Sequence, residues 1–85
     1  MMPAWTKGPT PRQFDCLRAI VAYKTEHGRS PTFRELAVAM GVHSPSTIYS
    51  FVERLGRKGY IWREGRQART IVILEAGRKV LEEAQ

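Results

Sequence analysis

The amino-acid sequence predicts a mainly α-helical fold with a small β-hairpin, in which three helices precede the hairpin and one helix follows it. Three observations point to this fold. Helix start signals recur ahead of apolar residues at helical spacing, two short runs rich in β-branched and aromatic residues follow Gly59, and an amphipathic pattern comes last. With 85 residues the sequence has room for one domain, close to the lower limit that a single hydrophobic core can stabilise.

The first helix is expected to follow an N-terminal arm, residues 1–9, which shows no periodicity and which we expect to be flexible. Thr10 is a typical N-cap, proline fits the first helical position, and Gln13 stands where its side chain can complete a capping box. The helix should run to about Glu26 and stop at Gly28, since glycine adopts the left-handed conformation that ends many helices. Its inward face carries Cys16, Leu17, Ile20 and Tyr23.

Residues 31–59 predict two short helices joined by a tight turn. Thr32 can cap the first helix with Glu35 completing a capping box, and a glycine is the expected stop. Ser44 can cap the second helix, and Pro45 fits its first position because no N–H is needed there. The apolar stripes are Leu36, Ala37 and Met40 in the first helix and Ile48, Phe51, Val52 and Leu55 in the second. The pair is typical of a helix-turn-helix, whose second helix reads the major groove, although two ordinary core helices would show the same caps and stops.

The segments 60–63 and 70–74 predict the strands of a hairpin, with a polar loop at 64–68 between them. Directly after a helix-turn-helix, a basic hairpin of two or three strands is the wing of a winged helix. Because side chains alternate across a strand, one set of apolar residues should face the helices and another should face away. The inward set is Ile61, Ile71 and Ile73, and the outward set is Trp62 and Val72.

Residues 75–85 have an amphipathic pattern that predicts a C-terminal helix, although Gly77 lowers the helix propensity. Several apolar residues of the chain fall off the inward faces of their elements. These are Phe14, Val21, Trp62, Val72, Val80 and Leu81. We expect either that the C-terminal helix folds back over them or that they form a surface for a partner, including a two-fold homodimer interface through the C-terminal helix.

Charge and composition limit the classes of function. Lys and Arg number 14 against 8 Asp and Glu, and the resulting charge of +6 favours a polyanionic partner, in the first place nucleic acid. The single cysteine, Cys16, cannot form an internal disulfide, and no Cys/His cluster has zinc spacing. No paired carboxylates, nucleophile with a base, or glycine-rich phosphate loop points to an enzyme. We therefore expect a non-enzymatic cytoplasmic protein without a cofactor, metal or small-molecule ligand, and without a membrane partner, since no apolar run reaches membrane-spanning length.

A family resemblance rests on residues spread in unbroken order over 10–74. They are Thr10-Pro11-Arg12-Gln13, Gly28 followed by Pro31-Thr32, Arg34-Glu35-Leu36-Ala37, Gly41 followed by Ser44-Pro45-Ser46, Leu55 before Arg57-Lys58-Gly59-Tyr60-Ile61, and Arg69 with Ile71 to Leu74. In this order they resemble the N-terminal DNA-binding domain of the LexA repressor family. The resemblance implies a winged helix-turn-helix over residues 10–74 that binds double-stranded operator DNA sequence-specifically, as a small bacterial or phage transcriptional regulator, in the first place a repressor.

The resemblance also implies base-reading positions at the start of the second helix of the motif. They carry over onto Ser44, Ser46, Thr47, Tyr49 and Ser50. At the last two positions the family's best-known operator reader has acidic residues, and a hydroxyl does not accept from the cytosine amino group in the way a carboxylate does. We therefore do not expect the LexA operator sequence. LexA repressors continue into a self-cleaving protease domain, whereas this sequence departs from them after residue 74, so we expect no autoproteolysis.

Phosphate contacts are expected from basic and polar residues around the motif and at the hairpin loop. They are Lys7, Arg12, Thr32, Arg34, Arg57, Lys58, Arg66, Gln67 and Arg69. For any one of the basic residues an ordinary solvated charge is an equal alternative. Two other functions stay open at this point: a winged-helix module that docks on another protein through its apolar face, and a nonspecific nucleic-acid binder, which predicts a salt dependence without a preferred site.

Overall fold

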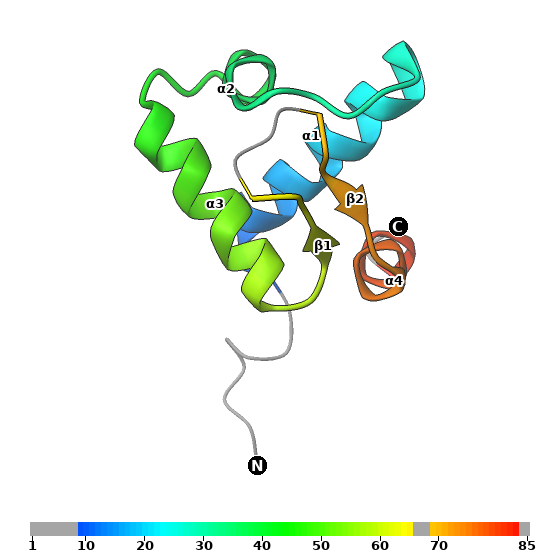
Figure 1. The fold of residues 1–85 in the computed structure, drawn as a ribbon. Helices are drawn as coiled ribbons and strands as arrows, with labels where there is room; N and C mark the ends of the chain where they lie inside the picture. The colour runs from blue at the N-terminus through cyan, green and yellow to red at the C-terminus, as the bar shows by residue number, and fades with distance from the viewer. Residues whose placement is uncertain (1–8, 66–68, 84–85) are drawn as a thin grey trace.

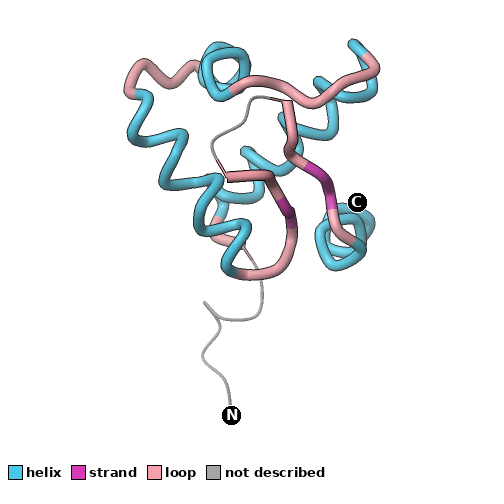
Figure 2. Tube along the Cα trace, in the orientation of Figure 1, coloured by secondary structure: helices cyan, strands magenta, loops and turns pink. Residues whose placement is uncertain are grey.

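The computed structural model describes residues 9–65 and 69–83 of the chain. The helices and strands in this part follow the order α1 (Pro11–His27), α2 (Phe33–Met40), α3 (Pro45–Arg57), β1 (Ile61–Trp62), β2 (Val72–Ile73) and α4 (Glu75–Glu83) (Figure 1). β1 and β2 pair antiparallel, and short loops connect the helices (Figure 2). The predicted fold class, a winged helix-turn-helix with a C-terminal helix, is confirmed.

Capping boxes begin α1 and α2, as the sequence predicts. In α1, Thr10 Oγ1 accepts from the Gln13 N–H at 3.3 Å, and Gln13 Oε1 accepts from the Thr10 N–H at 3.1 Å. In α2, Thr32 and Glu35 exchange the same pair of bonds at 3.1 and 2.9 Å. α1 ends at Gly28, whose φ of 72° is a left-handed conformation that glycine adopts without a steric penalty. Local sequence therefore sets where both helices begin and where α1 ends.

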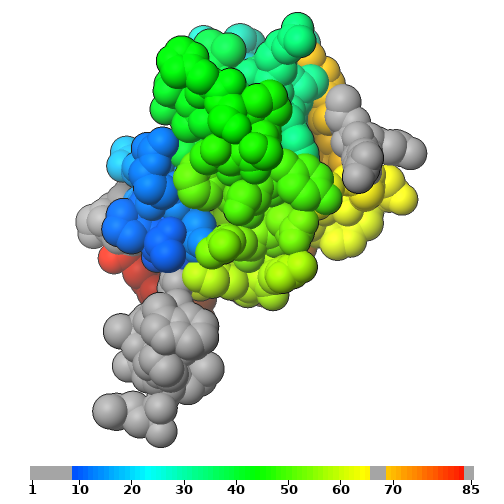
Figure 3. Space-filling view, turned by 90° about the vertical axis from the view of Figure 1, so that its left-hand side faces the viewer, coloured from blue at the N-terminus to red at the C-terminus, as the bar shows by residue number. Residues whose placement is uncertain are grey.

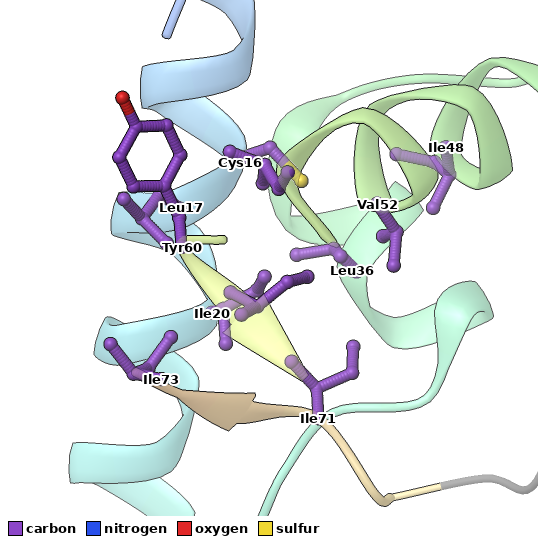
Figure 4. Packing of buried hydrophobic residues seen from close by; sticks show 11 residues of the cluster. Cys16, Leu17, Ile20, Leu36, Ile48, Val52, Tyr60, Ile71 and Ile73 are labelled. Atoms are coloured by element: carbon purple, nitrogen blue, oxygen red, sulfur yellow. The ribbon is translucent and has the colours of Figure 1, made fainter. Parts of the chain in front are cut away.

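One hydrophobic core lies between the helices and the hairpin (Figure 4). Its buried members are Cys16, Leu17 and Ile20 from α1, Leu36 from α2, Ile48, Val52 and Leu55 from α3, and Tyr60, Ile61, Ile71 and Ile73 from the hairpin segment. α1, α2 and α3 contact one another pairwise, and β1 packs against α3. Removal of these apolar side chains from water is the main favourable contribution to folding.

The hairpin register separates an inner face from an outer face. Ile61 pairs with Ile73 and both are buried, while Trp62 pairs with Val72 on the opposite face. Trp62 is 52% exposed and Val72 is 43% exposed. The predicted direction of these side chains is therefore confirmed. Both strands are shorter than predicted, and the second begins only after Ile71, because the Ile71 N–H donates to Ser30 Oγ and not to the facing strand.

α4 folds back onto α1 and lies beside β2 (Figure 1). Val80 and Leu81 from α4 pack against the core, as does Val21 from α1. This is the first of the two arrangements that the sequence leaves open for the apolar residues outside the inward faces. The C-terminal helix does not cover the remaining three residues of this set in the same way: Trp62 and Val72 are exposed, and Phe14 is half-buried.

Gly77 is buried in α4, and a side chain there would collide with the hairpin. A Cβ built on it would lie 2.5 Å from the Tyr60 carbonyl oxygen and 3.2 Å from Ile73 Cγ2. The glycine thus lets α4 approach the hairpin backbone closely. The predicted C-terminal helix forms despite the low helix propensity of glycine, because this packing outweighs it.

Candidate nucleic-acid interface

α3 occupies the middle of one face of the molecule (Figure 3). The first turn of α1, in blue, lies along one edge of this face, and the hairpin segment, in yellow and orange, lies along the other. An α-helix with its side chains fits the major groove of B-DNA, which is about 12 Å wide. The outward side of α3 is therefore the candidate surface for entry into the groove.

The start of α3 presents exposed hydroxyl groups. Ser44 has the backbone conformation of an N-cap, with φ −95° and ψ 118°, but its side chain makes no capping hydrogen bond. Its Oγ lies instead 2.9 Å from Ser46 Oγ. The expected side-chain cap at Ser44 is therefore wrong, because its hydroxyl bonds to the Ser46 hydroxyl and not to a backbone N–H of the first turn. Both serines are exposed, and each hydroxyl retains capacity to bond to a base edge.

The other candidate base contacts follow on the same side of α3. Thr47, Tyr49 and Ser50 are half-buried, whereas Ile48 between them is fully buried in the core. The Tyr49 ring is partly covered because it packs edge-on against Phe33 at the start of α2, with the ring centroids 5.9 Å apart. Contact between these side chains and bases stays a prediction.

An arginine stacks on an aromatic ring of α3 at each edge of the face. The Arg12 guanidinium of α1 lies 5.8 Å from the Phe51 ring centroid, and the Arg63 guanidinium, after β1, lies 5.1 Å from the Tyr49 ring centroid. Such contacts hold a planar guanidinium by its face and leave its N–H edge for an anion. Arg63 is not among the predicted phosphate contacts. The sequence does place Arg63 among the basic residues that follow Gly59, which could have marked it as a phosphate contact. Its position over the Tyr49 ring becomes visible only in the folded chain.

Two of the predicted phosphate contacts form ion pairs within their own helices. Arg12 lies 3.6 Å from Asp15 in α1, and Arg57 lies 2.8 Å from Glu53 in α3. Exposed pairs of this kind contribute only about 0–1 kcal/mol. A phosphate can therefore compete with the carboxylate for either arginine.

The remaining predicted phosphate contacts differ in their surroundings. Lys58 joins the end of α3 to the start of α1, since its Nζ donates to Gln13 Oε1 at 2.9 Å. The Thr32 hydroxyl belongs to the capping box of α2, and Arg34 is exposed in the first turn of that helix. Three predicted contacts lie outside the described residues. They are Lys7, Arg66 and Gln67.

Arg69 fastens the hairpin to α2. Its two terminal nitrogens each lie 3.0 Å from a carboxylate oxygen of Glu35, and Nη1 also donates to the Ser30 carbonyl at 3.2 Å. The Ile71 N–H donates to Ser30 Oγ at 3.2 Å, so the returning strand is held at two neighbouring points. The Arg69 backbone has φ 62°, a left-handed conformation that is uncommon for a residue with a side chain. The guanidinium predicted to bind phosphate is thus engaged within the protein, in what we call the Glu35–Arg69 clasp.

The same contacts stabilise the charged form of Glu35. Its pKa is lowered from 4.5 to about 2, first by the hydrogen bond from the Thr32 N–H and then by the hydrogen bond from Arg69. Glu35 in turn raises the pKa of Arg69 through the same hydrogen bond. One carboxylate therefore serves both the start of α2 and the position of the hairpin.

Acid should weaken the fold through Glu35. A carboxylate whose pKa is lower in the folded chain than in the unfolded chain stabilises the fold above about pH 4.5, and this contribution is lost as the pH falls toward 2. Glu35→Gln should therefore lower the unfolding temperature at neutral pH and reduce its further fall in acid. The control Glu53→Gln, on the surface of α3, should keep the wild-type acid dependence. Thermal unfolding followed by circular dichroism at neutral and acid pH measures this, and parallel curves for wild type and Glu35→Gln would contradict it.

Cys16 is the buried thiol that the sequence predicts. Burial raises its pKa to about 12, although the charge of Arg12 acts in the opposite direction, so the thiol stays protonated and unreactive. Across the described ranges, no three His, Cys, Asp or Glu side chains gather in a way that could hold a metal ion. None of the helices described is long and apolar enough to cross a membrane.

Sequence comparisons point to one family. The family model of the LexA DNA binding domain matches residues 6–70. The LexA repressor of Clostridium kluyveri (strain NBRC 12016) is 35% identical over 68 residues, which cover 80% of this chain and 34% of that protein. The LexA repressor of Ligilactobacillus salivarius is 39% identical over 72 residues, which cover 85% of this chain and 35% of that protein. The chain thus spans about a third of the length of these curated relatives.

A solved structure is similar as well. The transcriptional regulator Tm0710 from Thermotoga maritima matches with a TM-score of 0.66 and 35% sequence identity. The match covers 87% of this chain and 50% of that chain. Sequence and structure comparisons therefore point in the same direction.

Proposed function

Since the chain belongs to the LexA DNA-binding domain family, as residues 10–74 predict, we propose that it binds double-stranded DNA sequence-specifically and regulates transcription, in the first place as a repressor. The outward side of α3 supports this most, because the helix starts with exposed hydroxyl groups and an arginine, Arg12 or Arg63, stacks on one of its aromatic rings at each edge of the face. The floor of a major groove offers hydrogen-bond donors and acceptors, and its rims are phosphates. Such a protein works in the cytoplasm, on the DNA of the nucleoid.

The first half of α3 supplies the base contacts in this proposal. Ser44, Ser46 and Ser50 can donate to or accept from base edges, and Thr47 can also touch a thymine methyl group. Tyr49 adds a phenol on the same side of the helix. Even a good bidentate contact discriminates between bases by only about 1–3 kcal/mol. Specificity should therefore come from several of these positions together.

Phosphate contacts position α3 over the groove without carrying sequence information. Their proposed sources are Arg12, Thr32, Arg34, Arg57 and Lys58, with Lys7, Arg66 and Gln67 outside the described residues. Arg69 contributes by holding the hairpin through the Glu35–Arg69 clasp, since its own guanidinium is occupied there. Each phosphate that is neutralised releases counterions, which adds roughly 0.9 to the slope of log affinity against log salt concentration.

Selection of bound sequences from a random duplex pool tests this function. The affinity of the protein for the selected duplex is then compared with its affinity for a scrambled duplex at two salt concentrations. We expect a defined consensus that is preferred by at least ~10³ over the scrambled sequence. Weak binding without a consensus, with affinity that only follows salt, would contradict sequence-specific regulation and would favour a nonspecific or protein-binding role.

A homodimer through the outer hairpin face is the second part of the proposal. Trp62, Val72 and Leu74 are all more than a third exposed there, whereas Val80 and Leu81 of α4 pack against their own core. One winged-helix domain reads a half-site, and dimers pair half-sites about one helical turn apart. We expect sedimentation to show a wild-type dimer that Trp62→Asp dissociates. A monomer for both proteins would remove the homodimer.

A further inference from the structure

Three side chains from separate elements stack beside the outward side of α3. Phe33 is the first residue of α2, Tyr49 lies on α3, and Arg63 follows β1. The Arg63 guanidinium carbon lies 5.1 Å from the Tyr49 ring centroid and 5.7 Å from the Phe33 ring centroid. The two rings meet edge-on at 65°, with centroids 5.9 Å apart. This Phe33–Tyr49–Arg63 stack joins the hairpin to the helix proposed to read DNA.

Arg63 differs from three other arginines around this face in the partners of its guanidinium. Arg12, Arg57 and Arg69 each lie within ion-pair distance of a carboxylate. No carboxylate within residues 9–65 and 69–83 lies at such a distance from Arg63, whose hydrogen bond there goes to the Gly65 carbonyl. A guanidinium has five N–H donors, so donors remain for an anion. The rings hold Arg63 in place without neutralising its charge.

We propose that Arg63 binds a DNA phosphate at the rim of the groove that α3 enters, and that Tyr49 is a positioning residue that holds the Arg63 guanidinium through its ring. This inference rests on the proposed DNA binding by α3. A stacked guanidinium keeps its planar edge for two parallel bonds to phosphate oxygens, which an ammonium group cannot form. The stack thereby fixes the hairpin cation relative to the hydroxyls at the start of α3. In holding Arg63, Tyr49 acts through its aromatic ring, so this positioning role does not need its hydroxyl group.

Anisotropy titrations with the selected duplex, at several salt concentrations, test this role. Arg63→Gln and Tyr49→Leu should each weaken binding about tenfold and should each lower the salt slope by about one. Tyr49→Phe should recover most of the affinity lost in Tyr49→Leu, because the ring is retained. The double variant should bind no more weakly than Arg63→Gln alone, because the two residues act as one unit.

Arg78→Gln is the matched control, since it removes the same charge from α4, away from the stack, and should leave the salt slope unchanged. Circular dichroism of each variant checks that it is folded. Equal losses in Tyr49→Phe and Tyr49→Leu, additive losses in the double variant, or an unchanged salt slope in Arg63→Gln would each overturn the inference. The variants are compared only after the wild-type protein has been shown to prefer its selected duplex. A wild type without such a preference would overturn the proposed function itself.

Discussion

Leu36→Ala is expected to lower the free energy of unfolding by about 2–5 kcal/mol, because it removes a buried side chain and leaves a cavity. Leu36 is 0% exposed, on α2, which packs against both α1 and α3. The loss is a large part of the roughly 5–15 kcal/mol that keeps a typical domain folded. Since α2 supports α3 in the helix-turn-helix, Leu36→Ala should lose DNA binding under any condition in which it is unfolded.

Val38→Ala on the same helix is the control, because Val38 is 76% exposed. It should change the free energy of unfolding by no more than about 0.5 kcal/mol. Urea denaturation followed by circular dichroism measures both variants against wild type. Losses of similar size at Leu36 and Val38 would show that α2 does not pack with the face described here.

Gly77→Ala is expected to destabilise the protein by about 1–3 kcal/mol, although alanine is the better helix former. The new Cβ would lie 2.5 Å from the Tyr60 carbonyl oxygen, which accepts from the Leu74 N–H at 2.9 Å. This oxygen belongs to the backbone and cannot swing aside. α4 must therefore move away from the hairpin, and the packing of Val80 and Leu81 against the core should loosen.

Gly56→Ala in α3 is the matched control for that prediction. The nearest atom to a Cβ on Gly56 is the Ile61 carbonyl oxygen at 4.0 Å, which is an ordinary contact. Alanine should therefore stabilise this helix by roughly 0.5–1 kcal/mol. Thermal unfolding should move in opposite directions for the two variants, and a gain in stability at both glycines would contradict the close docking of α4.

Local signals in the sequence determine most of the fold. Thr10 and Thr32 act on backbone N–H groups within one helical turn, and the Gly28 stop acts equally locally, so residue spacing alone places these helix ends. The inner and outer faces of the hairpin follow from the two-residue period of a strand. Ser44 is the exception at a helix start, because its hydroxyl bonds to Ser46 and not to the backbone. The family resemblance rests on many of the same residues, and the family match confirms it.

Contacts between distant parts of the chain determine the rest, and spacing does not reveal them. Arg69 and Glu35 stand 34 residues apart, and nothing near either residue distinguishes an arginine that closes a clasp from one that binds phosphate. From the sequence alone Gly77 only lowers the helix propensity of its segment, and its close contact with the Tyr60 backbone depends on how α4 packs on the hairpin. The stack of Arg63 on Tyr49 likewise depends on how the hairpin packs against α3. Tertiary packing selects the partner in each case.

Amide chemical shifts of the isotope-labelled protein, followed by NMR during titration with the selected duplex, test DNA binding through α3 most directly. We expect the largest changes from Ser44 to Ser50, with further changes at the start of α1 and around Arg63. The scrambled duplex should give smaller changes at the start of α3, because phosphate contacts alone do not require the base-reading register. Changes centred on α4 around Val80, with α3 left unperturbed, would contradict a DNA-reading role for this helix.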